Sequence, residues 1–537
     1  MDDRLRGGPN REDNDGPLFE GRIVRCATKV PHWVDMGLIL GIHQRNHFHI
    51  GLVRKMWSIG IYVMGLVIIG MIHWTRKWRN PTCTAGRLPP GSMGLLLLGE
   101  TIPFFFPSKS LDIHPFLTTR IQKYGPLFKT NLVGRPVVVS SYPDFSHLIL
   151  QHEGKLVELW YMDSFVKLVG LSGSVKDGSC IIAGKIHKQL KKLIFEQLGP
   201  QNLKERLLSG LEETVNQALS NWTTVPFVKV KHACTVMIIN FTLRELFSYD
   251  PEKHGEIMEE EFTDFFEGLM SLPLNIPGTT YQRCLQKQKS TLMILRRMIE
   301  ERQESAGEIR RSPRDLLDDI VEEMKNNSLF TKDVMSYIMF GILIATFETI
   351  STTLTLTMIL LTQHPLVVQN LEKENEEILG NKEDTKTRMT WKKLKSMTFT
   401  MQVINESLRM GNFVPGYLRR AIKDIHVNGY TIPEGWTIMV VPSAIHFNPE
   451  TYKDPLTFNP WRWKDFAGNV AARNFIPFGG GVRSCPGVDF SKVLMSVFLH
   501  VLITKYRWSE IKRGEIVRAP IMGFGKGYCI KVSEKLK

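Results

Sequence analysis

A glycine-rich loop that carries a cysteine constrains this chain more than any other feature of its sequence. Residues 478–487 read FGGGVRSCPG, and a helical pattern begins near Asp489. Successive glycines let the backbone turn tightly and approach a flat ligand. Arg483 places a cation near the sulfur of Cys485, which favours the thiolate over the thiol, and N–H groups at the helix start can donate hydrogen bonds to that sulfur. The loop therefore predicts a metal-binding thiolate rather than a chance cysteine in a turn.

The bulk composition is that of a large globular protein. The chain has 537 residues, of which 43% are hydrophobic and 23% are charged, so it can bury a sizeable core. No internal repeat and no long Pro/Gly/Ser linker divides it, which favours one large domain. The seven cysteines are widely spaced, odd in number and form no CxxC pair. This pattern excludes a disulfide framework and favours a reducing compartment.

The chain is strongly basic, with a formal net charge of +14. Such a charge suits an acidic protein partner or an anionic membrane surface. The sequence has no basic stripe interleaved with aromatic residues and no zinc-finger spacing, so no nucleic acid partner is expected. Solvated lysines without any partner would give the same net charge.

An apolar stretch near the N-terminus predicts a membrane anchor. Residues 56–74 read MWSIGIYVMGLVIIGMIHW, carry no formal charge and are long enough to cross a bilayer. Trp57 and Trp74 stand at its ends, where aromatic rings prefer the interface, and the basic sequence RKWR at 76–79 places the C-terminal side in the cytosol. We therefore expect a transmembrane signal anchor at 56–75, a basic and proline-rich hinge at 76–95 and a large domain at 96–537.

Residues 1–55 are expected to be a disordered extension or the product of an alternative start site. They mix charges of both signs and show no clean helical period. Their acidic residues argue against a transit peptide. A chain that began at Met56 would carry a complete signal anchor.

A second apolar run extends from Val334 to Leu361. Its length would permit a membrane span, but Glu348 in its middle would be costly in lipid. We expect instead a long helix through the core of the large domain, with Glu348 and Thr349 facing a cavity. The alternative, a polytopic membrane protein that uses Glu348 as an ion site, leaves the cysteine loop unexplained.

The remaining sequence is mainly helical, with a minor β region. The segments Phe128–Leu132 and Pro136–Ser140, separated by Gly134, predict a β-hairpin. Helical periodicity dominates residues 185–410, short strand patterns return at 415–460, and a last helix is expected at Asp489–Lys505.

The cysteine loop resembles the haem-binding signature of the cytochrome P450 family, and further motifs follow in that family's order from about residue 85 onward. Glu406 and Arg409, with Arg462 downstream, resemble the family's buried Glu-Arg-Arg triad, which has a structural role. Glu348 and Thr349 match the acid–alcohol pair that supplies protons for oxygen activation.

Two neighbours of that pair depart from the family pattern. Thr346 stands where glycine is usual, and Ile350 stands where a second hydroxyl is common. We interpret both as tuning of the cavity and of the local helix geometry. A structural alternative for Thr349 is a hydroxyl that bonds its own helix backbone.

The resemblance implies a haem b cofactor with Cys485 as the axial ligand of the iron. The other residues that it implies for haem binding lie in the cysteine loop and in two distant segments: Phe478, Gly481, Arg483, Gly487, Arg419, His187 and Lys191. His187 and Lys191 match a pair that contacts the haem propionates, although a histidine and a lysine four residues apart are also common on helix surfaces.

Finer resemblance is to the plant group of the family that oxidises sterols and triterpenes and includes cucurbitadienol 11-hydroxylase. The segments that carry it are residues 124–130, 274–281, 395–400, 458–464 and 505–508. It implies the P450 fold and a monooxygenase that uses dioxygen and receives electrons from NADPH through a reductase. It further implies a hydrophobic substrate and a place in the endoplasmic reticulum membrane, with the catalytic domain in the cytosol.

Two other functions share a thiolate-bound haem. A related enzyme that rearranges peroxides needs no reductase, but the intact Glu348–Thr349 pair favours oxygen activation. A haem-binding sensor would show no turnover. By the family pattern, residues 159–171, 344–347 and 414–418 line the substrate cavity, where apolar side chains are equally consistent with ordinary core.

Overall fold

The computed structural model describes residues 35–79, 81, 83–96, 98–162, 166, 185–254, 265, 268, 271, 275–305, 314–380, 388–464, 466 and 473–535. The chain divides into two compact units, residues 1–76 and residues 77–537.

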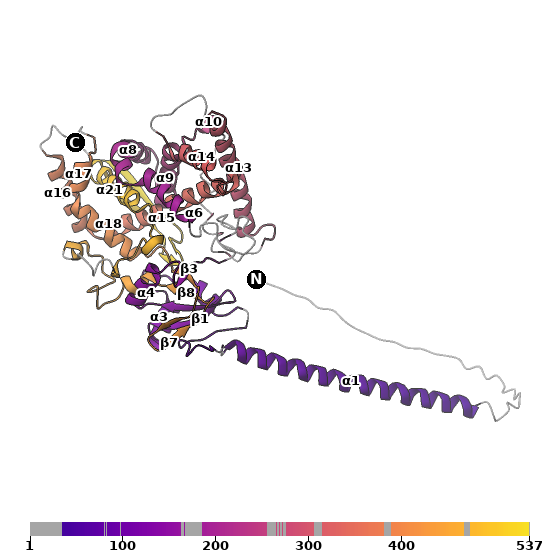
Figure 1. Ribbon diagram of the computed structural model, residues 1–537. Helices are drawn as coiled ribbons and strands as arrows, with labels where there is room; N and C mark the ends of the chain where they lie inside the picture. The colour runs from indigo at the N-terminus through magenta and orange to yellow at the C-terminus, as the bar shows by residue number, and fades with distance from the viewer. Residues whose placement is uncertain are drawn as a thin grey trace, which may run out of the picture. The chain divides into compact units, whose positions relative to one another are not determined.

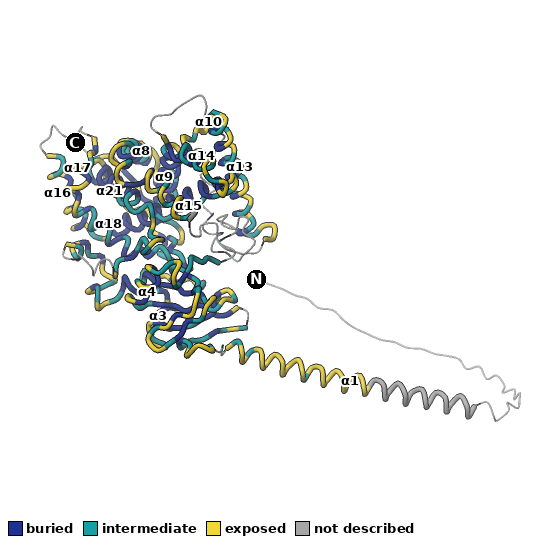
Figure 2. Tube along the Cα trace, viewed as in Figure 1, coloured by how far each residue is buried: buried dark blue, intermediate teal, exposed yellow. Residues whose placement is uncertain are grey.

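Helix α1 runs from Asp35 to Arg79 and contains the predicted anchor (Figure 1). It begins at Asp35 rather than Met56, so the expectation of disorder fails for residues 35–55, and residues 1–34 lie outside the described part. Residues 35–55 contain no proline, the residue that stops a helix most effectively. The most apolar 18-residue stretch within Arg54–Arg79 has a mean hydropathy of 1.8 with no buried residue (Figure 2). It is apolar enough to be a membrane anchor.

The second unit is built mainly from helices. Their bounds are α2 Thr101–Phe105, α3 Pro115–Tyr124, α4 Pro143–Gln151, α6 Lys185–Leu198, α7 Pro200–Asn202, α8 Leu208–Thr223, α9 Val230–Phe247, α10 Pro251–His254, α13 Thr280–Ser305, α14 Leu316–Asn326, α15 Lys332–Gln363, α16 Pro365–Leu379, α17 Trp391–Ser396, α18 Thr398–Gly411, α19 Pro442–His446 and α21 Val488–Lys505. Short helical turns are η1 Leu203–Leu207, η3 Pro460–Lys464 and η4 Gly481–Arg483.

The strands form several small sheets, of which the one containing β1, β3 and β8 lies beside α3 and α4 in Figure 1. Their bounds are β1 Leu127–Leu132, β2 Arg135–Ser140, β3 Val157–Leu159, β4 Val228–Lys229, β5 Tyr417–Ala421, β6 Ile425–Val427, β7 Tyr430–Ile432, β8 Thr437–Val440, β9 Tyr506–Arg513, β10 Val517–Arg518, β11 Met522–Gly523 and β12 Tyr528–Glu534. The largest sheet has the order β1-β2-β8-β5-β3. The predicted hairpin is confirmed, because β1 and β2 pair antiparallel from Leu127↔Ser140 to Leu132↔Arg135.

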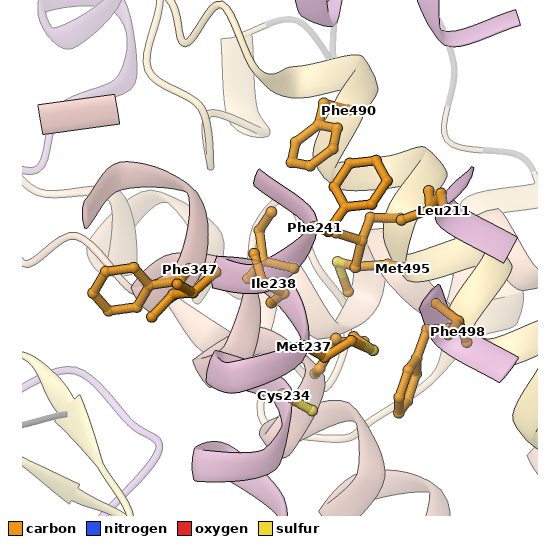
Figure 3. Packing of buried hydrophobic residues seen from close by; sticks show 14 of the residues in the cluster. Leu211, Cys234, Met237, Ile238, Phe241, Phe347, Phe490, Met495 and Phe498 are labelled. Carbon is orange, nitrogen blue, oxygen red and sulfur yellow. The ribbon is translucent and has the colours of Figure 1, made fainter. Parts of the chain in front are cut away.

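Helix α15 passes through the core, as predicted for the second apolar run. Thr331 caps its start by accepting a hydrogen bond from Val334 N, which satisfies one of the free N–H groups of the first turn. The helix contacts α9, α13, α18 and α21, and 72% of its most apolar stretch is buried. Figure 3 shows side chains of α9, among them Phe241, packed between Phe347 of α15 and Phe490 of α21. Protein, not lipid, therefore surrounds this helix.

Candidate functional site

The loop before α21 holds its cysteine through backbone geometry. Cys485 N donates to Phe478 O at 3.0 Å, which closes the loop. Gly481 has a φ of 64°, and a Cβ there would lie 2.1 Å from Leu150 O at the end of α4. Only glycine fits this approach, because both the dihedral angle and the space exclude a side chain. Gly487 N donates to Cys485 Sγ at 3.4 Å, as the sequence predicts for the start of the last helix.

Cys485 is both accessible and partly desolvated. Cys485 is an exposed residue, yet burial raises its pKa, while the Gly487 N–H and Lys191 lower it. A metal ion bound at Cys485 would deprotonate the thiol outright.

The cation that acts on Cys485 is Lys191 of α6, and this corrects the expectation that Arg483 favours the thiolate. Lys191 Nζ donates to Val482 O at 3.0 Å and to Ser484 Oγ at 2.9 Å. Burial lowers the pKa of Lys191, which Cys485 raises and Arg483 lowers further. The structure therefore places Lys191 against the cysteine loop.

Arg483 instead belongs to a buried cluster with Arg419 of β5 and Glu153. The Nε atoms of Arg483 and Arg419 lie 3.0 and 3.1 Å from the two carboxylate oxygens of Glu153, and none of the three side chains is more than 9% exposed. Arg419 Nε and Glu153 Oε2 nevertheless lack a hydrogen bond of good geometry. Burial lowers the pKa of Arg419, Glu153 raises it and Arg483 lowers it.

His187 lies within the electrostatic reach of this cluster. Burial, followed by Arg483, Lys191 and Arg419, lowers the pKa of His187 to about 4. Its imidazole is therefore neutral at neutral pH and can donate a hydrogen bond without adding charge. The four predicted haem-contact side chains of Arg419, Arg483, His187 and Lys191 are thus electrostatically coupled to one another.

One face of α15 is open within the otherwise buried stretch Ile338–Leu361. Gly341, Ala345 and Thr349 recur every four residues; Ala345 is exposed and the other two are half-buried. Small side chains on one stripe leave room for a ligand. Thr349 Oγ1 donates to Ala345 O at 2.9 Å, and Thr346 Oγ1 donates to Leu343 O at 2.8 Å. A hydroxyl that donates in this way keeps two acceptor sites.

Glu348 contacts the neighbouring helix α9. Its carboxylate is 3% exposed and lies 2.7 Å from the ammonium of Lys231, which is 32% exposed. One turn further along, Thr235 and Ser351 are hydrogen-bonded at 3.1 Å between the same two helices. The pair therefore connects the partly solvated end of Lys231 with the protein core. Lys231 carries no local sequence signal, since it lies 117 residues from Glu348.

The predicted triad is present and buried. Glu406 receives hydrogen bonds from Arg409 Nε at 2.9 Å and Nη2 at 2.8 Å, and from Arg462 Nε at 3.1 Å. Asn459 N and Trp463 Nε1 also donate to it, at 3.0 and 2.9 Å. The side chains of Glu406 and Arg409 are 0% exposed. The carboxylate is thus saturated with donors, the condition under which a buried ion pair is tolerated.

Two residues that the sequence analysis missed connect the triad to the cysteine loop. Arg409 Nη1 donates to His446 O, and Ile476 N donates to His446 Nε2 at 3.0 Å. Tyr417 OH donates to Ile476 O at 2.7 Å and accepts from Gly479 N at 2.9 Å. Because Nε2 of His446 accepts this bond, its Nδ1 carries the proton and donates to the side-chain oxygen Oδ1 of Asn412 at 2.6 Å. No local motif marks either residue, since each acts through chain segments distant in sequence.

These features fit a haem with a thiolate ligand. Cys485 is accessible, glycines permit close approach at the loop, and a stripe of small residues is open on the core helix. In the cluster of buried arginines Arg419 Nε lacks a well-formed hydrogen bond, and a propionate oxygen could accept one from this guanidinium. Among the described residues, no group of three or more His, Cys, Asp or Glu side chains is arranged to hold a metal ion by itself.

Comparison with known proteins agrees with this geometry. The family model described as cytochrome P450 matches residues 89–526. The chain is 43% identical to cucurbitadienol 11-hydroxylase of Siraitia grosvenorii, covering 89% of this chain and 100% of that protein. It is 41% identical to beta-amyrin 16-alpha-hydroxylase CYP87D16 of Maesa lanceolata, covering 90% and 100%.

The fold also matches a solved structure. The retinoic acid-bound cyanobacterial CYP120A1 superposes with a TM-score of 0.72 and 25% sequence identity, covering 84% of this chain and 100% of that one. The mainly helical fold with a minor sheet is therefore the P450 fold, which implies a haem-iron cofactor. Because the family model matches most of the length of this chain, the chain belongs to the cytochrome P450 family and is a monooxygenase.

Proposed function

We propose that the enzyme hydroxylates a hydrophobic plant triterpene or sterol, with electrons supplied from NADPH through a reductase. The observation that carries the proposal is Cys485, an exposed residue whose thiol is partly desolvated and accepts a hydrogen bond from Gly487 N in a glycine-rich loop. The names of the two hydroxylases at 41% and 43% identity support the substrate class.

In this proposal Cys485 is the axial ligand, and its loop, with Phe478, Gly481 and Gly487, holds one face of the haem. Arg419, Arg483 and neutral His187 bind the propionates. Bound haem supplies oxygen activation, while the protein supplies the ligand, protons and orientation. The triad keeps the loop in place through the hydrogen bonds of His446 and Tyr417.

Protons enter beside Lys231 and pass through Glu348. Consecutive side chains on a helix point about 100° apart, so Glu348 contacts α9 while Thr349 lies on the open stripe. A rotamer change of Glu348 carries a proton from the Lys231 side to the Thr349 side, where a hydroxyl acceptor is available. Glu348 therefore transfers the proton from the Lys231 side, and the hydroxyl of Thr349 delivers it, which is general acid–base catalysis by positioned side chains.

The substrate occupies the space beside the open stripe of α15. Residues 413–418 are all half-buried, which supports a second lining segment at 414–418. Of the predicted segment 159–171, residues 163–165 and 167–171 lie outside the described residues. A tetracyclic hydrocarbon skeleton suits a cavity with a stripe of small residues, because such ligands bind mainly by burial of apolar surface.

The reductase docks on the outer side of the cysteine loop. Val482 is 57% exposed, and the adjacent α6 carries the exposed Lys188 and Lys192. A basic surface here attracts an acidic flavoprotein and raises its association rate. The anchor in α1 holds the enzyme in the endoplasmic reticulum membrane in a single pass, with residues 96–537 as a cytosolic catalytic domain behind a hinge at 76–95.

The test is turnover of the full-length chain in lipid vesicles with a plant reductase, NADPH and dioxygen. Tetracyclic triterpenes and sterols are compared with a very-long-chain fatty acid of similar mass. We expect a product one oxygen heavier from the tetracyclic class only, and Thr349→Ala should consume NADPH with little product. A product formed from a hydroperoxide without reductase, with none from the tetracyclic compounds, would overturn the proposal.

A further inference from the structure

Glu153 is a buried acid at a position where the site would otherwise carry only positive charge. It follows α4 by two residues, and its Oε1 also accepts a hydrogen bond from Leu159 N of β3 at 2.9 Å. Glu153 thus connects three segments: the α4–β3 turn, strand β5 through Arg419 and the cysteine loop through Arg483. The last two contacts span 266 and 330 residues of sequence.

The contact geometry suits a part in orienting the arginines. Each guanidinium meets Glu153 through Nε, one of the five N–H donors that an arginine carries. The carboxylate therefore holds two like charges side by side, through a hydrogen bond from Arg483 Nε and an ionic contact with Arg419 Nε. It also removes one unit of positive charge from a site that must accept the two carboxylates of a haem.

We propose that Glu153 is a positioning residue of the haem site, which orients Arg419 and Arg483 and sets the local charge that the iron experiences. The inference rests on the proposed function, since it requires haem at this position. Loss of a negative charge near the iron favours the reduced state, which carries one positive charge fewer. Removing Glu153 should therefore ease reduction.

A neighbouring acid, five residues further along the chain, supplies the control. Glu158 pairs with Arg420, whose Nη2 lies 2.5 Å away, and both side chains are about 40% exposed. This pair has the same charges and also reaches β5, but Glu158 lies on β3 whereas Glu153 lies in the turn before it. It differs in exposure, and solvent screens its charge.

The experiment is a spectroscopic redox titration of the full-length haem-loaded chain beside Glu153→Gln, Glu153→Asp and Glu158→Gln. We expect Glu153→Gln to shift the reduction equilibrium about tenfold toward the reduced state, which is about 59 mV for a one-electron couple. Glu153→Asp keeps the charge and should shift it by less than half as much. Glu158→Gln should leave it unchanged, and haem release should accelerate only in the Glu153 variants.

A variant that is merely less stable would unfold at lower temperature without a change in potential. If Glu153→Gln and the parent share one potential, or Glu158→Gln shifts equally, the inference is wrong while the proposed function stands. Should Glu153→Gln fail to fold, the double variant Glu153→Gln/Arg419→Gln restores the charge balance. The reduction equilibrium constant of this double variant should lie within threefold of the parent's. A larger shift would overturn the inference. A parent chain that takes up no haem would overturn the proposed function as well.

Discussion

Replacing Glu406 by glutamine removes the charge that neutralises two arginines in the core. Glu406 is 0% exposed and receives five hydrogen bonds, from Arg409, Arg462, the backbone of Asn459 and the indole of Trp463. The new amide would turn two N–H donors toward groups that are themselves donors. Arg409, also 0% exposed, would lose its counter-ion in a region of low dielectric.

The magnitude follows from burial. Breaking a buried ion pair by removing one partner costs about 3–5 kcal/mol, whereas a domain is stable by about 5–15 kcal/mol in total. The half-exposed pair of Glu158 and Arg420 has similar contact distances, but pairs in solvent contribute about 0–1 kcal/mol. The same substitution at the two acids should therefore differ by several kcal/mol.

The assay is urea unfolding of the haem-loaded chain, followed by the Soret band and by far-ultraviolet circular dichroism. Glu406→Gln should lose haem and helix at much lower urea than the parent, and Glu158→Gln should match the parent. Because the loss originates in the core, added salt should not restore Glu406→Gln. The reasoning from burial would be refuted if the free energies of unfolding of the two variants differed by less than about 1 kcal/mol.

Three further predictions concern proton delivery, acid stability and the loop. Lys231→Met should reduce product formation about tenfold while haem content stays unchanged; an unaltered rate and solvent isotope effect would exclude this route. Burial lowers the pKa of His446 to about 3 and of His500 to about 4, so the unfolded chain binds more protons than the folded one below about pH 6.5. Stability should then fall by about 1.4 kcal/mol per pH unit for each histidine down to those pKa values, and His500→Gln should flatten the dependence of the urea midpoint between pH 7 and 5; an unchanged slope would contradict the assignment. Gly481→Ala places a Cβ against Leu150 O and should lower the ratio of Soret to protein absorbance, whereas Gly429→Ala, at a glycine of similar φ with open space, should not.

Local patterns predicted those parts of the site that lie close together in sequence. The cysteine loop is one run of ten residues, and Glu406 and Arg409 are one helical turn apart. The core helix was recognisable because a glutamate in an apolar run is costly in lipid. The fold class followed from periodicity and from the family resemblance.

Partners from distant segments were not predictable in the same way. Glu153 and Lys231 are ordinary charged residues in sequence, and only the packing of α4, β5, α9 and α15 brings each against its partner. For the same reason sequence proximity points to Arg483 as the cation beside Cys485, whereas Lys191 of α6 lowers the pKa of the thiol. Helix α1 begins at Asp35, further toward the N-terminus than the apolar stretch 56–74 indicates. Hydropathy does not mark this extension, because residues 35–55 are less apolar but contain no proline to stop the helix.

The most direct test of the central claim is the absorption spectrum of the reduced, carbon monoxide-bound full-length chain, recorded beside Cys485→Ala and the control Cys83→Ala. Cys83 is another free cysteine and is half-buried. The account predicts a red-shifted Soret band in the parent and in Cys83→Ala that is lost in Cys485→Ala. A parent without haem, or a band that persists in Cys485→Ala, would contradict it.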